Sequence, residues 1–254
     1  VLLAQSGTIA LAAGETVTMN VNPANSQVDL LVTPSTVDAL IENKKIVRAP
    51  EGRVIVSAQA YNELASGGIK NSGEISAAGI TKVGGKIVLG ASAELANSGT
   101  IDASSAVADG GSVSIDADKV TQSGLITVAG GTANSATGAT VDLSASAKGG
   151  EVSIAGNYIY IEGAAKIDAT GTTGGGKVLV GGDWQGGGDL RHAIKVAMDA
   201  NVSIDASAII NGDGGKVVLW SDVFNIEGAT RANGSLIARA GSLGGDGGQI
   251  ETSG

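Results

Sequence analysis

A short motif recurs seven times along the chain and constrains its fold more than any other feature. Each copy places a glycine before a polar residue, a β-branched aliphatic residue, a variable residue and, in six copies, a further aliphatic residue. The glycines lie 26, 33 or 39 residues apart, at Gly52, Gly85, Gly111, Gly150, Gly176, Gly215 and Gly248. Because every second residue after the glycine is apolar, each copy predicts a β-strand that is buried on one face.

A second pattern precedes each copy of the motif, and consists of two apolar residues on either side of one variable residue. The pairs are Val47/Ala49, Ile75/Ala77, Ile101/Ala103, Ile126/Val128, Ile167/Ala169, Ile204/Ala206 and Leu236/Ala238. Short strands at repeated positions predict an all-β chain folded as a parallel β-solenoid, in which each coil hydrogen-bonds to the next. We expect one domain over residues 1–254, with about ten coils.

Two segments near the start of the chain depart from this repeat and predict short helices. In 35–43, Ser35 stands three residues before Asp38, as in a capping box, and an apolar stripe follows. The segment 57–66 is rich in helix-forming residues and runs into the pair Gly67 and Gly68, which is typical of a helix end.

Composition excludes several classes of function. The chain has 41 glycines, 2% aromatic residues and a net charge of −9, so it repels phosphate backbones and offers bases little to stack on. We therefore expect no nucleic-acid partner. No apolar run approaches the roughly 18 residues of a membrane-spanning helix, and we expect no membrane insertion. Without cysteine there is no disulfide and no thiolate-ligated metal.

One copy of the motif resembles a nucleotide-binding loop. Gly171, Gly176 and Lys177 give the spacing G-x-x-x-x-G-K, but Val178 stands where the loop needs a hydroxyl for Mg²⁺. A strand also follows, where a phosphate-binding loop opens a helix. The other copies place Ser, Glu or Gln at the lysine position. We therefore expect no nucleotide cofactor.

Aspartates stand directly before several of the glycine pairs, at Asp109, Asp213 and Asp246. They are reminiscent of calcium-binding β-rolls, but those require a strict nine-residue period that this chain lacks. Asx-type turns before a glycine with positive φ are the expected alternative. We expect no metal site.

The segment 181–195 is predicted to be an insertion loop, because it lies in one of the 39-residue spacings and has an unusual composition. It concentrates Trp184, Asp189, Arg191 and His192, and loops on a rigid scaffold often carry binding residues. A tryptophan can stack on a sugar ring while Arg and Asp hydrogen-bond its hydroxyls. These four residues are the candidate site for carbohydrate or a protein partner. The alternative is that Trp184 packs down and anchors the loop.

Three outward aspartates raise the alternative of an enzyme. Asp102, Asp168 and Asp205 occupy one position of the second pattern and could serve as the acid and base of a polysaccharide lyase or hydrolase. Thr127 interrupts the row, and outward aspartates commonly only solubilise a strand. We assign no catalytic residue.

Several stretches resemble the filamentous haemagglutinin family of two-partner secretion exoproteins, which are large bacterial adhesins. They are "GTIALAAGETVTM" (7–19), "VDALIENKKIVRAPEGRVIVSAQA" (37–60), "IKNSGEISA" (69–77) and "GDGGKVVLWSDVFNIEGATRANGSLIARAGSLGGDGGQIETSG" (212–254). The resemblance covers essentially the whole chain. Its motifs are repeats, so they indicate a fold more specifically than a ligand.

This resemblance implies a right-handed parallel β-helix that a dedicated outer-membrane transporter secretes to the surface of a Gram-negative cell. The segment is similar to the β-helix that follows the secretion domain, so we expect a fragment of a larger exoprotein whose missing amino-terminal domain meets the transporter. The expected function is a non-enzymatic adhesin or biofilm scaffold that binds polysaccharide or a cell-surface glycan. A polysaccharide-cleaving enzyme and a stalk for a distal toxin or binding module remain alternatives.

Overall fold

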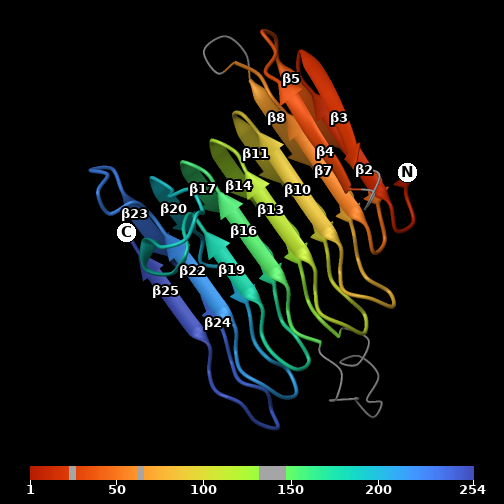
Figure 1. Ribbon diagram of the computed structural model, residues 1–254. Helices are drawn as coiled ribbons and strands as arrows, with labels where there is room; N and C mark the ends of the chain where they lie inside the picture. The colour runs from red at the N-terminus through yellow and green to blue at the C-terminus, as the bar shows by residue number, and fades with distance from the viewer. Residues whose placement is uncertain (23–26, 62–65, 132–146) are drawn as a thin grey trace.

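The chain folds as a parallel β-helix, which confirms the predicted fold class (Figure 1). A computed structural model describes residues 1–22, 27–61, 66–131 and 147–254. Within these ranges three parallel sheets of eight, eight and seven strands run the length of the stack, and each coil but the last contributes one strand to each sheet in turn. The coils rise in chain order from the N-terminal end, in red, to the C-terminal end, in blue.

The strands of each sheet follow one another at the same place in successive coils. The first sheet holds β1 (Leu2–Leu3), β6 (Ile46–Arg48), β9 (Glu74–Ser76), β12 (Thr100–Asp102), β15 (Leu125–Thr127), β18 (Lys166–Asp168), β21 (Ser203–Asp205) and β24 (Ser235–Ile237). The second holds β2 (Thr8–Ala13), β7 (Arg53–Ala58), β10 (Lys86–Ala91), β13 (Ser112–Asp116), β16 (Glu151–Ala155), β19 (Lys177–Val180), β22 (Lys216–Trp220) and β25 (Gln249–Ser253). The third holds β5 (Ala39–Asn43), β8 (Gly67–Asn71), β11 (Glu94–Asn97), β14 (Lys119–Gln122), β17 (Tyr158–Ile161), β20 (Lys195–Met198) and β23 (Ala229–Ala232).

The recurring glycine motif forms the second sheet in the predicted register. Ser112, the polar residue of its copy, pairs with Lys86 on one side and Glu151 on the other. The β-branched position points inward, and six of its seven members are at most 1% exposed: Val54, Ile87, Val113, Val152, Val178 and Val217. The seventh, Ile250, is 45% exposed because it lies on β25, the end strand of this sheet in the described chain. The second pattern likewise forms the first sheet, where Ile101 pairs with Ile75 and Ile126.

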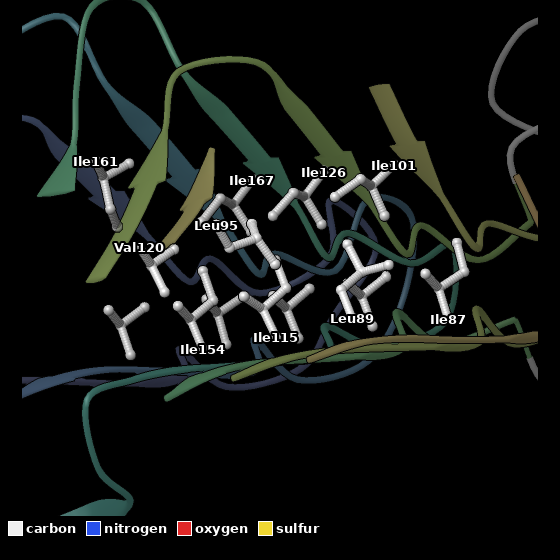
Figure 2. Close-up of a cluster of buried hydrophobic side chains, with 14 of the residues drawn as sticks. Ile87, Leu89, Leu95, Ile101, Ile115, Val120, Ile126, Ile154, Ile161 and Ile167 are labelled. Atoms are coloured by element: carbon white, nitrogen blue, oxygen red, sulfur yellow. The ribbon is translucent and has the colours of Figure 1, made fainter. Parts of the chain in front are cut away.

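The inward aliphatic side chains fill a narrow interior (Figure 2). Isoleucines and leucines from the facing sheets meet there, among them Ile87, Leu89, Ile101, Ile115 and Ile126, all at most 1% exposed. Full burial of each such side chain contributes about 1.5–3 kcal/mol. A core this thin has no room for aromatic rings, which accounts for their scarcity in the sequence.

The number of coils differs from the prediction of about ten. The described residues form eight coils, the last of which contributes no strand to the third sheet. The long spacing from Gly176 to Gly215 is one coil with a longer turn, so dividing the chain by the shortest spacing overestimates the count. The 39 residues from Gly176 to Gly215 contain β19, β20 and β21 once each.

The helix predicted over 35–43 is wrong, and the described residues of the segment 57–66 are not helical. In 35–43 the chain forms β5, because Ala39 and Ile41 alternate inward and the strand pairs with β8 in the next coil. The hydroxyl of Ser35 accepts a hydrogen bond from the amide of Val37, two residues on, which closes a turn in place of a helix cap. In 57–66, Ser57 and Ala58 end β7. Residues 62–65 lie outside the described ranges.

A hairpin of β3 (Thr16–Asn22) and β4 (Gln27–Thr33) is inserted into the first coil. Its strand β4 lies over the outer face of β2 and β7, where an Arg53 guanidinium nitrogen donates to the carbonyl oxygen of Val28. The outward side chain of Ile55 is consequently only 7% exposed.

Candidate functional site

The predicted insertion occupies the turn between β19 and β20. The two preceding coils make this turn with residues 117–118 and 156–157 alone, whereas here the chain runs from 181 to 194. Gly181 has φ of 71°, a conformation that favours glycine, and it starts the departure from the coil. A short 3-10 turn, η1 (Trp184–Gly186), follows.

The insertion folds back onto the outer face of the second sheet and encloses the ring of Trp220. A Cβ atom on Gly182 or Gly186 would come within 2.6 Å of that ring, so only glycine lets the backbone approach so closely. His192 lies beside the same ring, with 6.1 Å between the ring centroids. Under this cover the outward side chains of Leu179 and Val218 are at most 3% exposed.

Trp184 is held in place by charged neighbours. The carboxylate of Asp183 accepts a hydrogen bond of 2.7 Å from the backbone amide of Trp184 and lies 3.4 Å from the ammonium of Lys177. The ammonium of Lys216 lies 5.2 Å from the centroid of the Trp184 ring, within the range of a cation–π interaction. The next residue, Gln185, donates its amide to the carboxylate of Glu251, two coils further on.

Arg191 reaches in the opposite direction along the stack. Its guanidinium lies 2.5 Å from the carboxylate of Asp116 and donates to the carbonyl oxygen of Ala117 at 2.9 Å and to the side chain of Asn157 at 3.2 Å. Asp116 belongs to the fourth coil and the insertion to the sixth, so the loop is attached to coils on both sides of its own. The insertion therefore works as a clasp across several coils.

The structure does not bring the four predicted binding residues together. Trp184 contacts Lys216, His192 lies beside Trp220, and Arg191 binds Asp116. Asp189 is exposed and makes no hydrogen bond or ion pair within the described part of the chain. Sequence reasoning missed Asp183 and Lys216, because their contacts with the insertion depend on how the loop folds back onto the sheet. The carbohydrate site remains a prediction.

The clasp is expected to loosen in acid. Burial raises the pKa of Asp183, but the hydrogen bond from the Trp184 amide and the charges of Lys177 and Lys216 outweigh it, so the pKa lies below its usual 3.8. A carboxylate whose pKa is lowered by folding contributes stability that is lost as the pH falls through the folded-state pKa. Below pH 3.8 we expect hydrogen exchange at 183–186 to accelerate. Asp183→Asn should remove this acid response, and an unchanged response would contradict the assignment.

The three outward aspartates each hold a local turn. Asp102 accepts hydrogen bonds from the amide and hydroxyl of Ser104, and Asp168 does the same with Thr170. Asp205 accepts from the amide of Ser207. These bonds fix the corner after each first-sheet strand and give the carboxylates a structural role.

A shallow trough of about 1070 Å³ runs along the corner where the glycine pairs stack. Asp109 and Asp213 stand at its side, and each carboxylate accepts a 2.7 Å hydrogen bond from an amide of the following coil, at Lys148 and Asp246. These bonds join coils, whereas the sequence predicted local Asx turns. The expectation of a positive φ for the glycine after each aspartate was also wrong, because Gly110, Gly214 and Gly247 lie outside that region. At Gly110 and Gly214 glycine is needed for another reason, since a Cβ atom would overlap the backbone of the next coil.

No set of three or more His, Cys, Asp or Glu side chains is grouped to hold a metal ion in the described ranges. Those ranges also contain no helix of the length and apolarity needed to cross a membrane.

Comparison with known proteins points to the fold. No protein-family model matches the sequence, and no curated protein matches it. Among solved structures, the chain is similar to the secretion domain of HMW1 from Haemophilus influenzae, with 23% sequence identity and a TM-score of 0.54. The match covers 99% of this chain and 53% of that one, so the chain spans about half the length of the solved structure. Over nearly its whole length, the chain therefore has a fold similar to that of the HMW1 secretion domain.

Proposed function

We propose that this chain is an extracellular β-helical segment of a Gram-negative two-partner secretion exoprotein and serves as a non-enzymatic scaffold in adhesion. The observation that carries the proposal is the β-helix itself, which is similar to the HMW1 secretion domain over 99% of this chain. The stretches that resemble filamentous haemagglutinin support the same class of exoprotein. The cell surface or a biofilm matrix is the proposed location.

An outer-membrane transporter is the proposed export partner. A β-helix can fold coil by coil as it leaves a pore, because the strands of each coil pair only with those of the neighbouring coils. The chain has no cysteine that could form disulfides in the oxidising periplasm before export. Export is tested by expressing the complete exoprotein with and without its transporter and probing intact cells with protease. If the exoprotein reached the cell surface equally well without the transporter, the proposed export partner would be wrong.

The finer part of the proposal is that the insertion binds a polysaccharide or a cell-surface glycan through Trp184, Asp189, Arg191 and His192. Asp189 is exposed, and the rings of Trp184 and His192 are only partly buried, so surface remains for a sugar. The alternative of a purely structural stalk is supported by the contacts that Trp184 and Arg191 already make. Trp184 contacts Lys216 and Arg191 binds Asp116, and both contacts hold the insertion against the coils.

A glycan array on the purified chain tests this binding. We expect Trp184→Ala to weaken binding about tenfold or more, because the stacking surface is lost. Phe224→Ala is the matched control, since Phe224 is an exposed aromatic residue in the corresponding turn of the next coil. An array without binding would favour the stalk. Release of new sugar reducing ends from a polysaccharide would favour the enzyme and contradict the proposal.

A further inference from the structure

The strand β3 is the most exposed strand of its length in the described chain. All seven of its residues are exposed, and its one strand partner there is β4. Its apolar side chains lie on one face, where Val17, Met19 and Val21 are 46%, 58% and 56% exposed. A long, open strand edge of this kind is a template for pairing with another chain.

The pattern of polar and apolar residues in β3 is symmetric about its centre. Around Met19 at its centre, TVTMNVN places a polar residue, a valine and a second polar residue on each side. The strand contains no charge, no proline and no glycine. Three other edge strands carry charges that discourage pairing: β5 and β25 each contain a glutamate, and β23 contains an arginine. The uncharged edge strands β1 and β24 are only two and three residues long. The edge strand β2 is uncharged, but it is half-buried beneath the hairpin.

We propose that two copies of this chain dimerise through β3, which pairs with the β3 of the second copy in an antiparallel arrangement across a two-fold axis. The two hairpins then form one four-stranded antiparallel sheet. In this register Met19 lies opposite the second Met19, and Val17 lies opposite Val21. Each pair joins apolar side chains on the same face, and Thr18 lies opposite Asn20 on the other face.

A second copy suits this strand better than an unrelated partner. A two-fold interface has to be complementary to itself, and the symmetric pattern of β3 meets that condition over its whole length with Met19 at the axis. The chain has a net charge of −9, so two copies repel one another wherever charged surfaces meet. An edge without charge allows them to approach. Of the nearby acidic residues, Glu15 lies just before the start of β3, and Asp29 lies on the neighbouring strand β4.

Sedimentation of the chain over a range of concentrations tests the proposal. We expect a dimer that Met19→Lys weakens by about tenfold or more, because the two ammonium groups would face each other across the axis. Leu31→Lys is the matched control: Leu31 is 67% exposed on β4 of the same hairpin and should leave the dimer intact. Mixing Met19→Lys with Met19→Glu should restore a dimer, since the opposite charges meet at the axis.

Cross-linking tests the register directly, because the chain has no cysteine of its own. Met19→Cys should form a disulfide-linked dimer on mild oxidation, whereas Leu31→Cys should not. A chain that remains monomeric at every concentration would overturn the proposal, and would mean that something other than a second copy covers β3. A dimer that survives Met19→Lys, or that cross-links equally through Leu31→Cys, would also overturn it.

Discussion

Gly149→Ala should lower the stability of the β-helix by about 3 kcal/mol or more, whereas Gly247→Ala should change it by about 0.5 kcal/mol or less. Both glycines are the first of a stacked pair, and neither has a positive φ. A Cβ atom on Gly149 would overlap the carbonyl group of Ala169 and lie 2.6 Å from the amide nitrogen of Gly176, both in the following coil. A Cβ atom on Gly247 would meet nothing within 4 Å in the described chain.

Urea denaturation followed by circular dichroism measures both variants. The comparison isolates close stacking, since alanine reduces the flexibility of the unfolded chain equally at both positions. Gly90→Ala is a further control, because a Cβ atom there also meets nothing within 4 Å. If Gly149→Ala and Gly247→Ala lowered the midpoint equally, the glycines would matter for turn conformation and not for contact between coils.

The same stacking accounts for the second glycine of each pair. A Cβ atom on Gly111, Gly150 or Gly176 would overlap the carbonyl of the second glycine one coil earlier. The repeat that identifies the fold in the sequence is therefore a consequence of how closely the backbones approach at this corner.

The sequence predicted two of the three sheets in register, because their inward positions hold β-branched and small aliphatic residues in every coil. The third sheet could not be found in this way, since its inward residues change from Asn71 and Asn97 to Ile161 and Met198 along one row. The helices predicted at 35–43 and 57–66 rested on local capping and propensity. Pairing with the next coil outweighed both signals.

The candidate site was predictable only as an insertion. The composition of 181–195 indicated an insertion loop. The contacts of that loop, however, join residues far apart in the sequence, such as Arg191 with Asp116 and Gln185 with Glu251. Whether an exposed arginine faces sugar or a carboxylate of another coil depends on the stacking order, which periodicity alone does not provide.

Buried amides form a ladder inside the first coils, which the sequence pattern did not predict. The side-chain amide of Asn43 donates to Asn71, Asn71 donates to Asn97, and Asn97 donates to Gln122, over distances of 2.7–2.9 Å. Gln122 then donates to the carbonyl of Gly124. From Asn71 to Gln122 the members are at most 2% exposed, so each depends on its neighbours for its hydrogen bonds.

Replacing one member should therefore be costly. Asn97→Leu leaves the amide of Asn71 without its short partner and the side-chain oxygen of Gln122 without a donor. Each such buried group costs about 1–3 kcal/mol, so we expect a loss of about 2–4 kcal/mol in urea denaturation. Ser98→Ala is the control, because its hydroxyl makes only a 3.5 Å contact at the adjoining turn.

Replacing all three buried members of the amide ladder at once should lower the stability by less than the sum of the three single replacements. The same row continues as Ile161 and Met198 in later coils, which shows that this position accepts apolar side chains. In the triple variant with leucine at 71, 97 and 122, no buried amide is left without a partner, and Asn43 can still bind water at the half-open end. We expect the triple loss to fall below the sum of the three single losses by about 1–3 kcal/mol. Strictly additive losses would show that the ladder stabilises the coils through each side chain separately and not through the continuous row of hydrogen bonds.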